Sequence, residues 1–534
     1  MRPRLSRRSA LGLLAGAGAA VTLGAAGYGQ LARPSTGRLL SSTAELPEPF
    51  KVPLPVPATA RPVATDGGRD VYEVTQREAE VEILPGLKTT IWGYDGGFPG
   101  STFVGRRGRP VSVRVRNRLP VPTSTHLHGG ITAPESDGYP TDLLLPVGCG
   151  NPARPAGGRW TPAASHGDHV APGDWQLREG EKTYEYPLDQ QAATLWYHDH
   201  RMDFSGPQVW RGLAGFFLVH DEQEQALPLP SGERDIPLMI CDRSFAADGA
   251  LVYPALDDSC TGIPGVQGAY AAGVLGDVQL VNGAPWPVLE VAAVRYRFRL
   301  LNAANARRYR LALEADGRPG GPLVQIGSDA GLLERPVAHE AITLAPAERF
   351  DVVVDFGRFP PGSTVTLVNT IGEGQMRQVL QFRVTRQAKD DSAVPTRLAA
   401  PAQPLGRDQA VAVRHFDFRR TEAGDDQAMW TINGRPFTTT DTWATPRLDT
   451  VELWRLSSDF HHPVHLHLAQ FQVLTRGGKP RAATDAGWKD TVDVRPYEVV
   501  EVLVRFRGYR GRYMLHCHNL EHEDMAMMAN FDVV

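Results

Sequence analysis

Cysteine and methionine are scarce in this sequence, and residues of like charge do not form long runs. The chain has four cysteines and nine methionines among 534 residues. Four cysteines exclude a disulfide-dense scaffold and argue against an iron–sulfur protein. The net charge is -4 and no lysine or arginine stripe occurs, so nucleic acid is not an expected partner.

Long apolar runs are also missing, apart from one near the N-terminus. "SRRS", which contains Arg7 and Arg8, precedes an uncharged Gly/Ala-rich stretch from Ala10 to about Ala26. A basic segment before such a stretch indicates an export signal, and the paired arginines resemble a twin-arginine signal, predicted over residues 1–35. A short membrane anchor is the alternative, although the stretch is short and Gly-rich for a spanning helix. We therefore expect a secreted, periplasmic or cell-envelope protein without stable membrane association.

The remaining sequence is rich in turn residues and in alternating apolar patterns. It contains 43 prolines and 54 glycines, and 42% of its residues are hydrophobic. Runs such as "PVSVRVRNRL", "VRYRFRLLN", "FDVVVDF" and "VVEVLVRFR" alternate with period two, which predicts half-buried strands. Many short strands with turn signals predict an all-β protein built from sandwiches or barrels. A chain of this length exceeds what a single core usually holds, so several domains are expected.

An internal repeat divides the chain. "FPGSTF", "VNGAPWPV" and "INGRPF" each precede a strand rich in Val and Arg. "THLHGG" follows the first of these strands and "HHPVHLH" follows the third, whereas the middle copy continues as "NAANARRY" without histidine. The predicted β domains span residues 45–225, 232–390 and 405–534.

Ten of the sixteen histidines lie in four short clusters at equivalent ends of the first and third repeats. The clusters are His126 and His128; His198 and His200; His462, His465 and His467; and His516, His518 and His522. An H-x-H pair on a strand points both rings to one face, where they can share a metal or bridge two metals. We expect a metal site between the first and third domains, since ligand sites tend to form between domains.

The stretch "RYMLHCHNLEHEDMAMM", residues 512–528, favours copper as that metal. Cysteine and imidazole with a weak methionine are the ligands of a blue-copper site. Cys517, His522 and Met527 can come from one strand and its loop, with a further histidine from His462 or His465. Zinc also binds cysteine and histidine, but it would not explain ten clustered histidines with one cysteine.

The histidine motifs carry a family resemblance over roughly residues 50–534. "HLHGG", "WYHDH", "HPVHLH" and "HCHNLEHEDMAMM" resemble the four copper signatures of multicopper oxidases. The forms present here are most similar to the branch containing spore-coat laccase, bilirubin oxidase and phenoxazinone synthase. The resemblance implies three cupredoxin-like Greek-key domains, with the first and third supplying every copper ligand.

The resemblance also implies four copper ions per chain. His462, Cys517 and His522 would hold the type 1 copper, with Met527 as axial ligand. His126 and His465 would hold the type 2 copper. The type 3 pair would take the six remaining histidines: His128, His198, His200, His467, His516 and His518.

The implied reaction is that of a laccase-like oxidase. A small phenolic or aminophenolic donor would lose single electrons at the type 1 copper, and the trinuclear cluster would reduce dioxygen to water. Cys517 is joined in sequence to His516 and His518, which gives the electron a short covalent route. Asp137 and Glu523 match acidic positions implicated in proton supply. The alternative interpretation of Asp137 is a residue of an Asp-Gly turn, and that of Glu523 is a charge exposed to solvent.

Several alternatives stay open at the level of sequence. The donor could be bilirubin or an aminophenol, although "SSDFHHPVHLH" lacks the tryptophan of fungal bilirubin oxidases. The low methionine count argues against a cuprous-ion oxidase. A non-catalytic cupredoxin-repeat envelope protein or a copper nitrite reductase is disfavoured by the intact Cys517 and ten histidines. A monomer is expected, and a disulfide among Cys149, Cys241 and Cys260 is left undecided.

Overall fold

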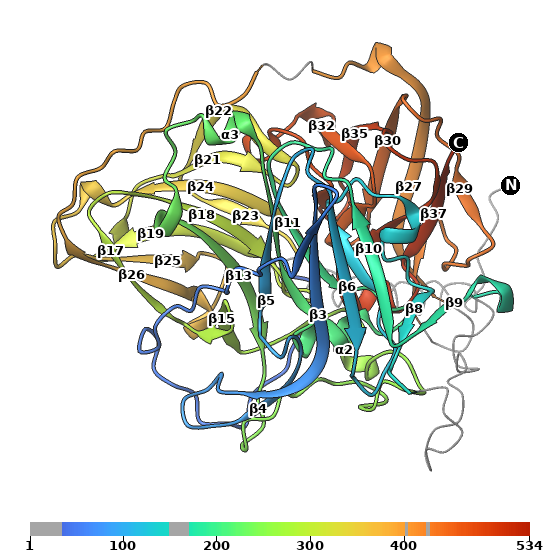
Figure 1. Ribbon diagram of the computed structural model, residues 1–534, viewed down its shortest axis with the longest axis horizontal. Helices are drawn as coiled ribbons and strands as arrows, with labels where there is room; N and C mark the ends of the chain where they lie inside the picture. The colour runs from blue at the N-terminus through green and yellow to red at the C-terminus, as the bar shows by residue number, and fades with distance from the viewer. Residues whose placement is uncertain (1–34, 149–169, 401–403, 423–427) are drawn as a thin grey trace, which may run out of the picture.

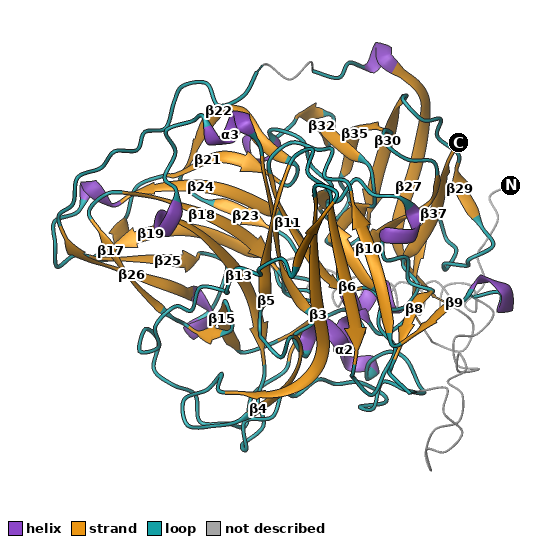
Figure 2. Cartoon of the chain, viewed as in Figure 1, coloured by secondary structure: helices purple, strands orange, loops and turns teal. Residues whose placement is uncertain are grey.

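The computed structural model describes residues 35–148, 170–400, 404–422 and 428–534. Strands dominate this part of the chain and its helices are short, which confirms the all-β prediction (Figure 2). No helix among the described residues is long and apolar enough to cross a bilayer. The predicted export signal, apart from Ser35, and Cys149 lie outside the described residues, whereas Cys241 and Cys260 are buried free thiols.

Residues 64–220 form a pair of sheets in the centre of Figure 1, within the range predicted for the first domain. One sheet has the order β10-β6-β3-β2 with β4 on β3, the other has the order β5-β12-β11-β7, and β8 pairs with β9. The elements are β2 (Ala64–Asp66), β3 (Arg69–Val81), β4 (Thr89–Tyr94), β5 (Gly100–Arg106), β6 (Val111–Asn117), β7 (Thr125–His128), β8 (Asp142–Leu145), β9 (Gln176–Glu179), β10 (Glu181–Tyr186), β11 (Ala193–Asp199), α2 (Ser205–Trp210), β12 (Ala214–His220) and α3 (Glu222–Gln225).

Residues 235–386 form two larger sheets on the left of Figure 1. Their orders are β16-β15-β13-β18-β24-β21-β22 and β17-β26-β25-β19-β20, with β23 on β19. The short strand β1 (Arg38–Leu39) pairs with β14 of this part of the chain. The strands are β13 (Asp235–Arg243), β14 (Val274–Leu275), β15 (Val278–Val281), β16 (Ala284–Pro285), β17 (Val288–Ala292), β18 (Arg295–Asn302), β19 (Tyr309–Ala315), β20 (Arg318–Pro319), β21 (Leu323–Ser328), β22 (Gly331–His339), β23 (Ile342–Leu344), β24 (Arg349–Asp355), β25 (Thr364–Asn369) and β26 (Gln378–Arg386).

Residues 410–533 form the third pair of sheets, on the right of Figure 1. The orders are β28-β27-β30-β35-β32-β33 and β29-β37-β36-β31-β34. The elements are β27 (Ala410–Glu422), β28 (Ala428–Ile432), β29 (Thr442–Ala444), β30 (Val451–Ser458), β31 (His462–Leu466), β32 (Gln470–Arg476), β33 (Lys479–Pro480), β34 (Thr491–Val494), β35 (Val499–Arg505), β36 (Gly511–Cys517), α4 (Leu520–Asp524) and β37 (Met528–Val533).

Alternation in the sequence becomes alternation in burial on several strands, but not on all. Along β10 the side chains of Lys182, Tyr184 and Tyr186 are buried while those between them are exposed, as period two predicts. The run "RYRFRLLN" of β18 differs from the half-buried strand that we predicted. Arg297 and Arg299 are buried because Glu224, Asp235 and Asp351 surround them with carboxylates.

The first and third domains meet through two short helices. The α2 backbone N–H groups of Ser205 and Gly206 each donate to the Asp524 carboxylate of α4, at 2.8 Å. A buried carboxylate that accepts two backbone hydrogen bonds fixes both helix ends. This contact holds the loop after β36 against the end of β11, which brings histidine motifs of the two domains together.

Candidate metal centre

Strand register brings the histidine pairs face to face within each domain. His126 on β7 lies opposite His198 on β11, and His465 on β31 lies opposite His516 on β36. All ten clustered histidines are at most 1% exposed. The sequence pattern that placed two rings on one face of a strand therefore produces buried groups of rings, several of them shared between the first and third domains.

One group of possible metal ligands combines Cys517 with two histidines of the third domain. His462 Nδ1 lies 3.4 Å from Cys517 Sγ, His522 Nδ1 lies 3.6 Å from it, and the two ring nitrogens are 3.2 Å apart. Met527 is fully buried in the same hydrophobic core as Cys517, and its carbonyl accepts the Cys517 N–H at 3.1 Å. The three converging atoms are the imidazole and thiolate ligands that a blue-copper site requires.

The other histidines form groups shared between the first and third domains. His200, His467 and His516 make one group, in which Nε2 of His516 lies 3.3 Å from Nε2 of each of the other two rings. The remaining groups of histidines are His128, His198 and His518, and His126, His128 and His465. Each group has ligand atoms within 4.8 Å of one another.

The outer nitrogen of most rings is held by protein oxygen. His126 Nδ1 donates to the Asp137 carbonyl at 2.5 Å, and His198 Nδ1 donates to the Asp199 carbonyl at 2.9 Å. Among the clustered rings of the described chain, the nitrogens without a hydrogen-bond partner are His126 Nε2, His128 Nδ1, His198 Nε2, His200 Nδ1, His465 Nε2 and both nitrogens of His518. Buried polar atoms are rarely unpaired, so these orphaned nitrogens fit a set of copper ligands.

Burial also keeps these rings in the form that binds metal. Burial, together with neighbouring imidazoles, lowers the pKa of His198 to about 3 and that of His200 to about 4. A metal binds the neutral imidazole, so neither ring has to lose a proton at neutral pH before it binds copper.

Asp137 lies at the histidine groups and not at the surface, which argues against a plain turn residue. One of its carboxylate oxygens lies 2.7 Å from His467 Nδ1, and its side chain is 1% exposed. Burial raises the pKa of Asp137 to about 8. Glu135 and Tyr139, two residues away on either side in the sequence, line a cavity of about 240 Å³, whereas Asp137 itself does not line it.

Glu523 is also buried and not a solvated charge. It lies on α4, with Oε2 at 3.1 Å from His516 Nδ1 and Oε1 at 3.6 Å from His200 Nδ1. A carboxylate beside the outer nitrogens of two candidate ligands orients both rings. Both acidic residues singled out from the sequence thus contact candidate ligands.

Some residues of the site escaped the sequence analysis. Trp430 stacks on His522 with ring centroids 3.6 Å apart, and Asp459 lies 3.3 Å from His462 Nε2. Asp490 and Thr491 contact His128 and His465. The sequence signal for Asp490 and Thr491 is weak: they are polar residues in "WKDTVDV", residues 488–494, next to a short run that alternates valine with a polar residue.

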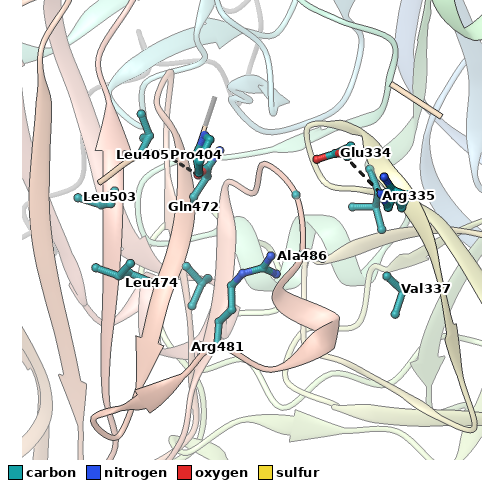
Figure 3. Close-up of a pocket in the computed structure, with 13 residues that line it drawn as sticks. Glu334, Arg335, Val337, Pro404, Leu405, Gln472, Leu474, Arg481, Ala486 and Leu503 are labelled. Atoms are coloured by element: carbon teal, nitrogen blue, oxygen red, sulfur yellow. Dashed lines mark hydrogen bonds and ion pairs between the residues drawn. The ribbon is translucent and has the colours of Figure 1, made fainter. Parts of the chain in front are cut away.

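A cavity of about 510 Å³ lies away from these groups, between the second and third domains. Figure 3 shows Glu334, Arg335 and Val337 on one side of it, and Gln472, Leu474 and Arg481 on the other. None of its lining residues belongs to a metal-binding group of the described chain. The chemistry of the protein is therefore centred on the buried histidines and not on this cavity.

A three-domain β fold with a Cys/His group and adjoining histidine groups defines a copper oxidase. Family models described as multicopper oxidase match residues 75–151, 174–224 and 413–534. A laccase of Bacillus stratosphericus is 36% identical, with 91% of this chain and 99% of the relative covered. A bilirubin oxidase of Albifimbria verrucaria is 33% identical, with 93% and 84% covered.

Solved structures agree with this assignment. The crystal structure of a multicopper oxidase from Pediococcus acidilactici superposes with a TM-score of 0.75 at 31% identity and covers 93% of each chain. The chain belongs to the multicopper oxidase family. It is a laccase-like copper oxidoreductase with type 1, type 2 and type 3 copper and dioxygen as acceptor, and the three-domain fold expected from the motifs is confirmed.

Proposed function

We propose that this enzyme oxidises small phenolic and aminophenolic donors and passes their electrons to dioxygen. The observation that carries the proposal is the position of Cys517. It lies in one group with His462 and His522, while its sequence neighbours His516 and His518 lie in two other groups. Bound copper would supply one-electron chemistry on the donor side and four-electron reduction of dioxygen to water on the other.

Ring orientation supports one assignment of ligands. His462, Cys517 and His522, with Met527, would hold the type 1 copper, and His126 and His465 would hold the type 2 copper through their unpaired Nε2 atoms. The type 3 pair would be divided between His128, His198 and His518 on one side and His200, His467 and His516 on the other. Every clustered histidine then has a ligand role.

Two carboxyl groups are placed to supply protons to the dioxygen side. Asp137 contacts His467, and Glu135 and Tyr139 line the 240 Å³ cavity, which would be the route of protons from solvent. Glu523 contacts His516 and approaches His200. Each acid lies beside a different part of the same histidine cluster, so protons can arrive from two sides.

The nature of the donor rests on what the type 1 region contains. Only nine methionines occur, and those near Cys517 lie within its own motif, which disfavours cuprous ion as donor. A small aromatic donor would deliver its electron through the buried ring of His522, which stacks on Trp430. Export by the Arg7-Arg8 signal and a monomeric state complete the proposal, with dioxygen and a small aromatic reductant as partners.

Bilirubin oxidation is the second candidate, favoured by the similarity to the Albifimbria verrucaria bilirubin oxidase. A donor panel with an oxygen electrode separates the candidates. We expect oxygen uptake with phenols and aminophenols to exceed uptake with bilirubin or cuprous ion at equal concentration. A purified, copper-loaded protein that is colourless and inert towards every donor would contradict the oxidase proposal. Preferred turnover of bilirubin would contradict only the choice of donor.

A further inference from the structure

Two charged residues of the middle domain lie beside the shared histidine groups. Arg349 begins β24 and Asp329 lies between β21 and β22, and both are 0% exposed. No residue of 232–390 belongs to a metal-binding group among the described residues. Through these two side chains the middle domain contacts Asp490 and Thr491, which in turn contact two candidate copper ligands.

The Arg349 guanidinium uses all five of its N–H groups. Nη1 donates to Asp490 Oδ1 at 2.7 Å and to the Ala347 carbonyl, and Nη2 donates to Asp490 Oδ2 and to the Asp329 carbonyl. Nε donates to the Thr194 carbonyl of the first domain at 3.0 Å. A lysine ammonium has three donors and no planar fork, so it cannot replace this set of contacts.

Asp329 holds the backbone of the same segment of the third domain. Its Oδ1 accepts the Arg349 N–H at 2.8 Å, and its Oδ2 accepts the N–H groups of Asp490 and Thr491, each at 3.3 Å. Lys489 forms an ion pair with the same carboxylate at 2.9 Å. The middle domain thus fixes both the backbone and the side chain of residues 489–491.

Asp490 and Thr491 in turn hold two copper-ligand candidates. Asp490 Oδ1 and Thr491 Oγ1 each lie 3.1 Å from His128 Nε2. The Asp490 carbonyl accepts His465 Nδ1–H at 2.9 Å, and Thr491 Oγ1 lies 3.3 Å from the same nitrogen. The opposite nitrogens, His128 Nδ1 and His465 Nε2, are left without a protein partner. The two rings stack with centroids 3.6 Å apart.

The glycine after His128 supports the same arrangement. A Cβ at Gly129 would lie 2.8 Å from Arg349 Nη2 and 2.9 Å from Asp490 Oδ2, and this glycine has a φ of +87°. The ion pair therefore occupies the space that a side chain at this position of "HLHGG" would need. Gly129 of the first domain thus leaves room for the ion pair between Arg349 of the second domain and Asp490 of the third.

We propose that Arg349 and Asp329 are positioning residues of the trinuclear copper site. They hold Asp490 and Thr491 so that His128 and His465 present their unpaired nitrogens towards the type 3 and type 2 positions. The middle domain then contributes to copper binding without supplying a ligand. This proposal concerns copper loading, and it holds whichever donor the enzyme oxidises.

The test compares Arg349→Lys with Arg299→Lys in the full-length, copper-loaded protein. Arg299 is a matched control because it is equally buried in the middle domain and also contacts Thr194, at 3.2 Å, but it pairs with Asp235 and Glu224 and not with Asp490. Copper per chain, the paramagnetic resonance signal of the type 2 copper and the near-ultraviolet band of the type 3 pair are measured. The blue band of the type 1 copper is the internal reference.

We expect Arg349→Lys to alter or lose the type 2 and type 3 signals and to bind those ions about 10- to 100-fold more weakly, with the blue band retained. Arg299→Lys should keep all signals. Unchanged signals in Arg349→Lys, or equal losses in both variants, would overturn the proposal. If Arg349→Lys does not fold, Thr491→Val decides, because valine keeps the shape of threonine and lacks only its hydroxyl. Altered type 2 and type 3 signals in this variant support the proposal, and intact signals refute it.

Discussion

The Trp430 indole lies flat against the His522 imidazole, with ring centroids 3.6 Å apart and 24° between the ring planes. Its Nε1 donates to the Ala271 carbonyl at 2.9 Å, and the neighbouring Ala272 carbonyl lies 3.2 Å from His522 Nε2. The third domain therefore covers a face of this histidine and the second domain covers its edge. Both contacts act on the ring that the resemblance makes a ligand of type 1 copper.

Removing this indole should change the type 1 site and leave the trinuclear signals intact. Trp430→Ala should cost about 3–5 kcal/mol of unfolding free energy, as expected for a buried tryptophan, and should shift the blue band and the type 1 reduction potential. Denaturant titration and a redox titration measure both effects. Trp454→Ala is the control, since this buried tryptophan packs on Phe416, Phe506 and Phe531. A shift of equal size in the control would count against a specific role for Trp430.

Cys517 should be needed for colour and turnover together. Cys517→Ser replaces the thiolate ligand by a hydroxyl of similar size, so the blue absorption should disappear and donor-driven oxygen uptake should fall to background. Optical spectra and an oxygen electrode check both. A serine variant that still oxidises donors at the parent rate would rule out the assigned electron route.

Asp137→Asn should slow dioxygen reduction and keep the blue band. Burial raises the pKa of Asp137 to about 8, so its carboxyl group holds a proton at neutral pH and loses it as the pH rises through that value. The rate of the parent enzyme should therefore decline above about pH 8, and the asparagine variant should be slow throughout and lack this inflection. Turnover measured across pH tests the role, which full activity of the variant at every pH would disprove.

Neighbouring His200 and His516 hold the pKa of Glu523 below its ordinary value although burial opposes this, so Glu523→Gln replaces a carboxylate that can accept and pass on a proton by an amide that cannot. We expect turnover to fall by about 10²- to 10⁴-fold, the usual contribution of a positioned acid or base. Reduction of the type 1 copper by the donor should be unaffected. It is measured without dioxygen as the bleaching of the blue band in a stopped-flow experiment. If the bleaching step slows as much as turnover does, Glu523 acts on electron transfer and not on proton supply.

The copper-free protein should lose stability in mild acid. The pKa of His198 is lowered to about 3 and that of His200 to about 4, against an ordinary value of 6.5, mainly by burial. Below about pH 6.5 the unfolded chain therefore binds more protons than the folded one, and the unfolding free energy falls by about 1.4 kcal/mol per pH unit for each group. Denaturant titrations between pH 7 and about pH 4 measure the slope. A flat profile for the copper-free protein would contradict the prediction, and bound copper should reduce the slope.

The strands and the histidine clusters could be predicted because both are local patterns. Period two in "EKTYEY" follows from the pleat of one strand, and H-x-H spacing places His126 and His128 on one face whatever the tertiary structure is. The structure gathers all ten clustered histidines into buried groups. Their division between copper types stays a prediction, and so do the domain bounds.

The supporting residues could not be predicted because their roles depend on partners far away in the chain. Arg349 looks like an ordinary strand arginine until Asp490 of another domain meets it. The burial of Arg297 was missed for the same reason, since it depends on Glu224 and Asp351. Charged residues are expected at the surface unless paired, and a single sequence does not show which pairs form.

The contact between His200 and His516 joins residues that are 316 positions apart, and α4 and β37 are the last elements of the chain. During synthesis the first two domains can form their sheets before six of the ten clustered histidines, all in the third domain, have left the ribosome. Contacts of such long sequence separation form late in folding. Copper occupancy in this enzyme therefore reports that the whole chain has been made and folded, and a chain that ends before residue 516 has no complete place to hold the trinuclear ions.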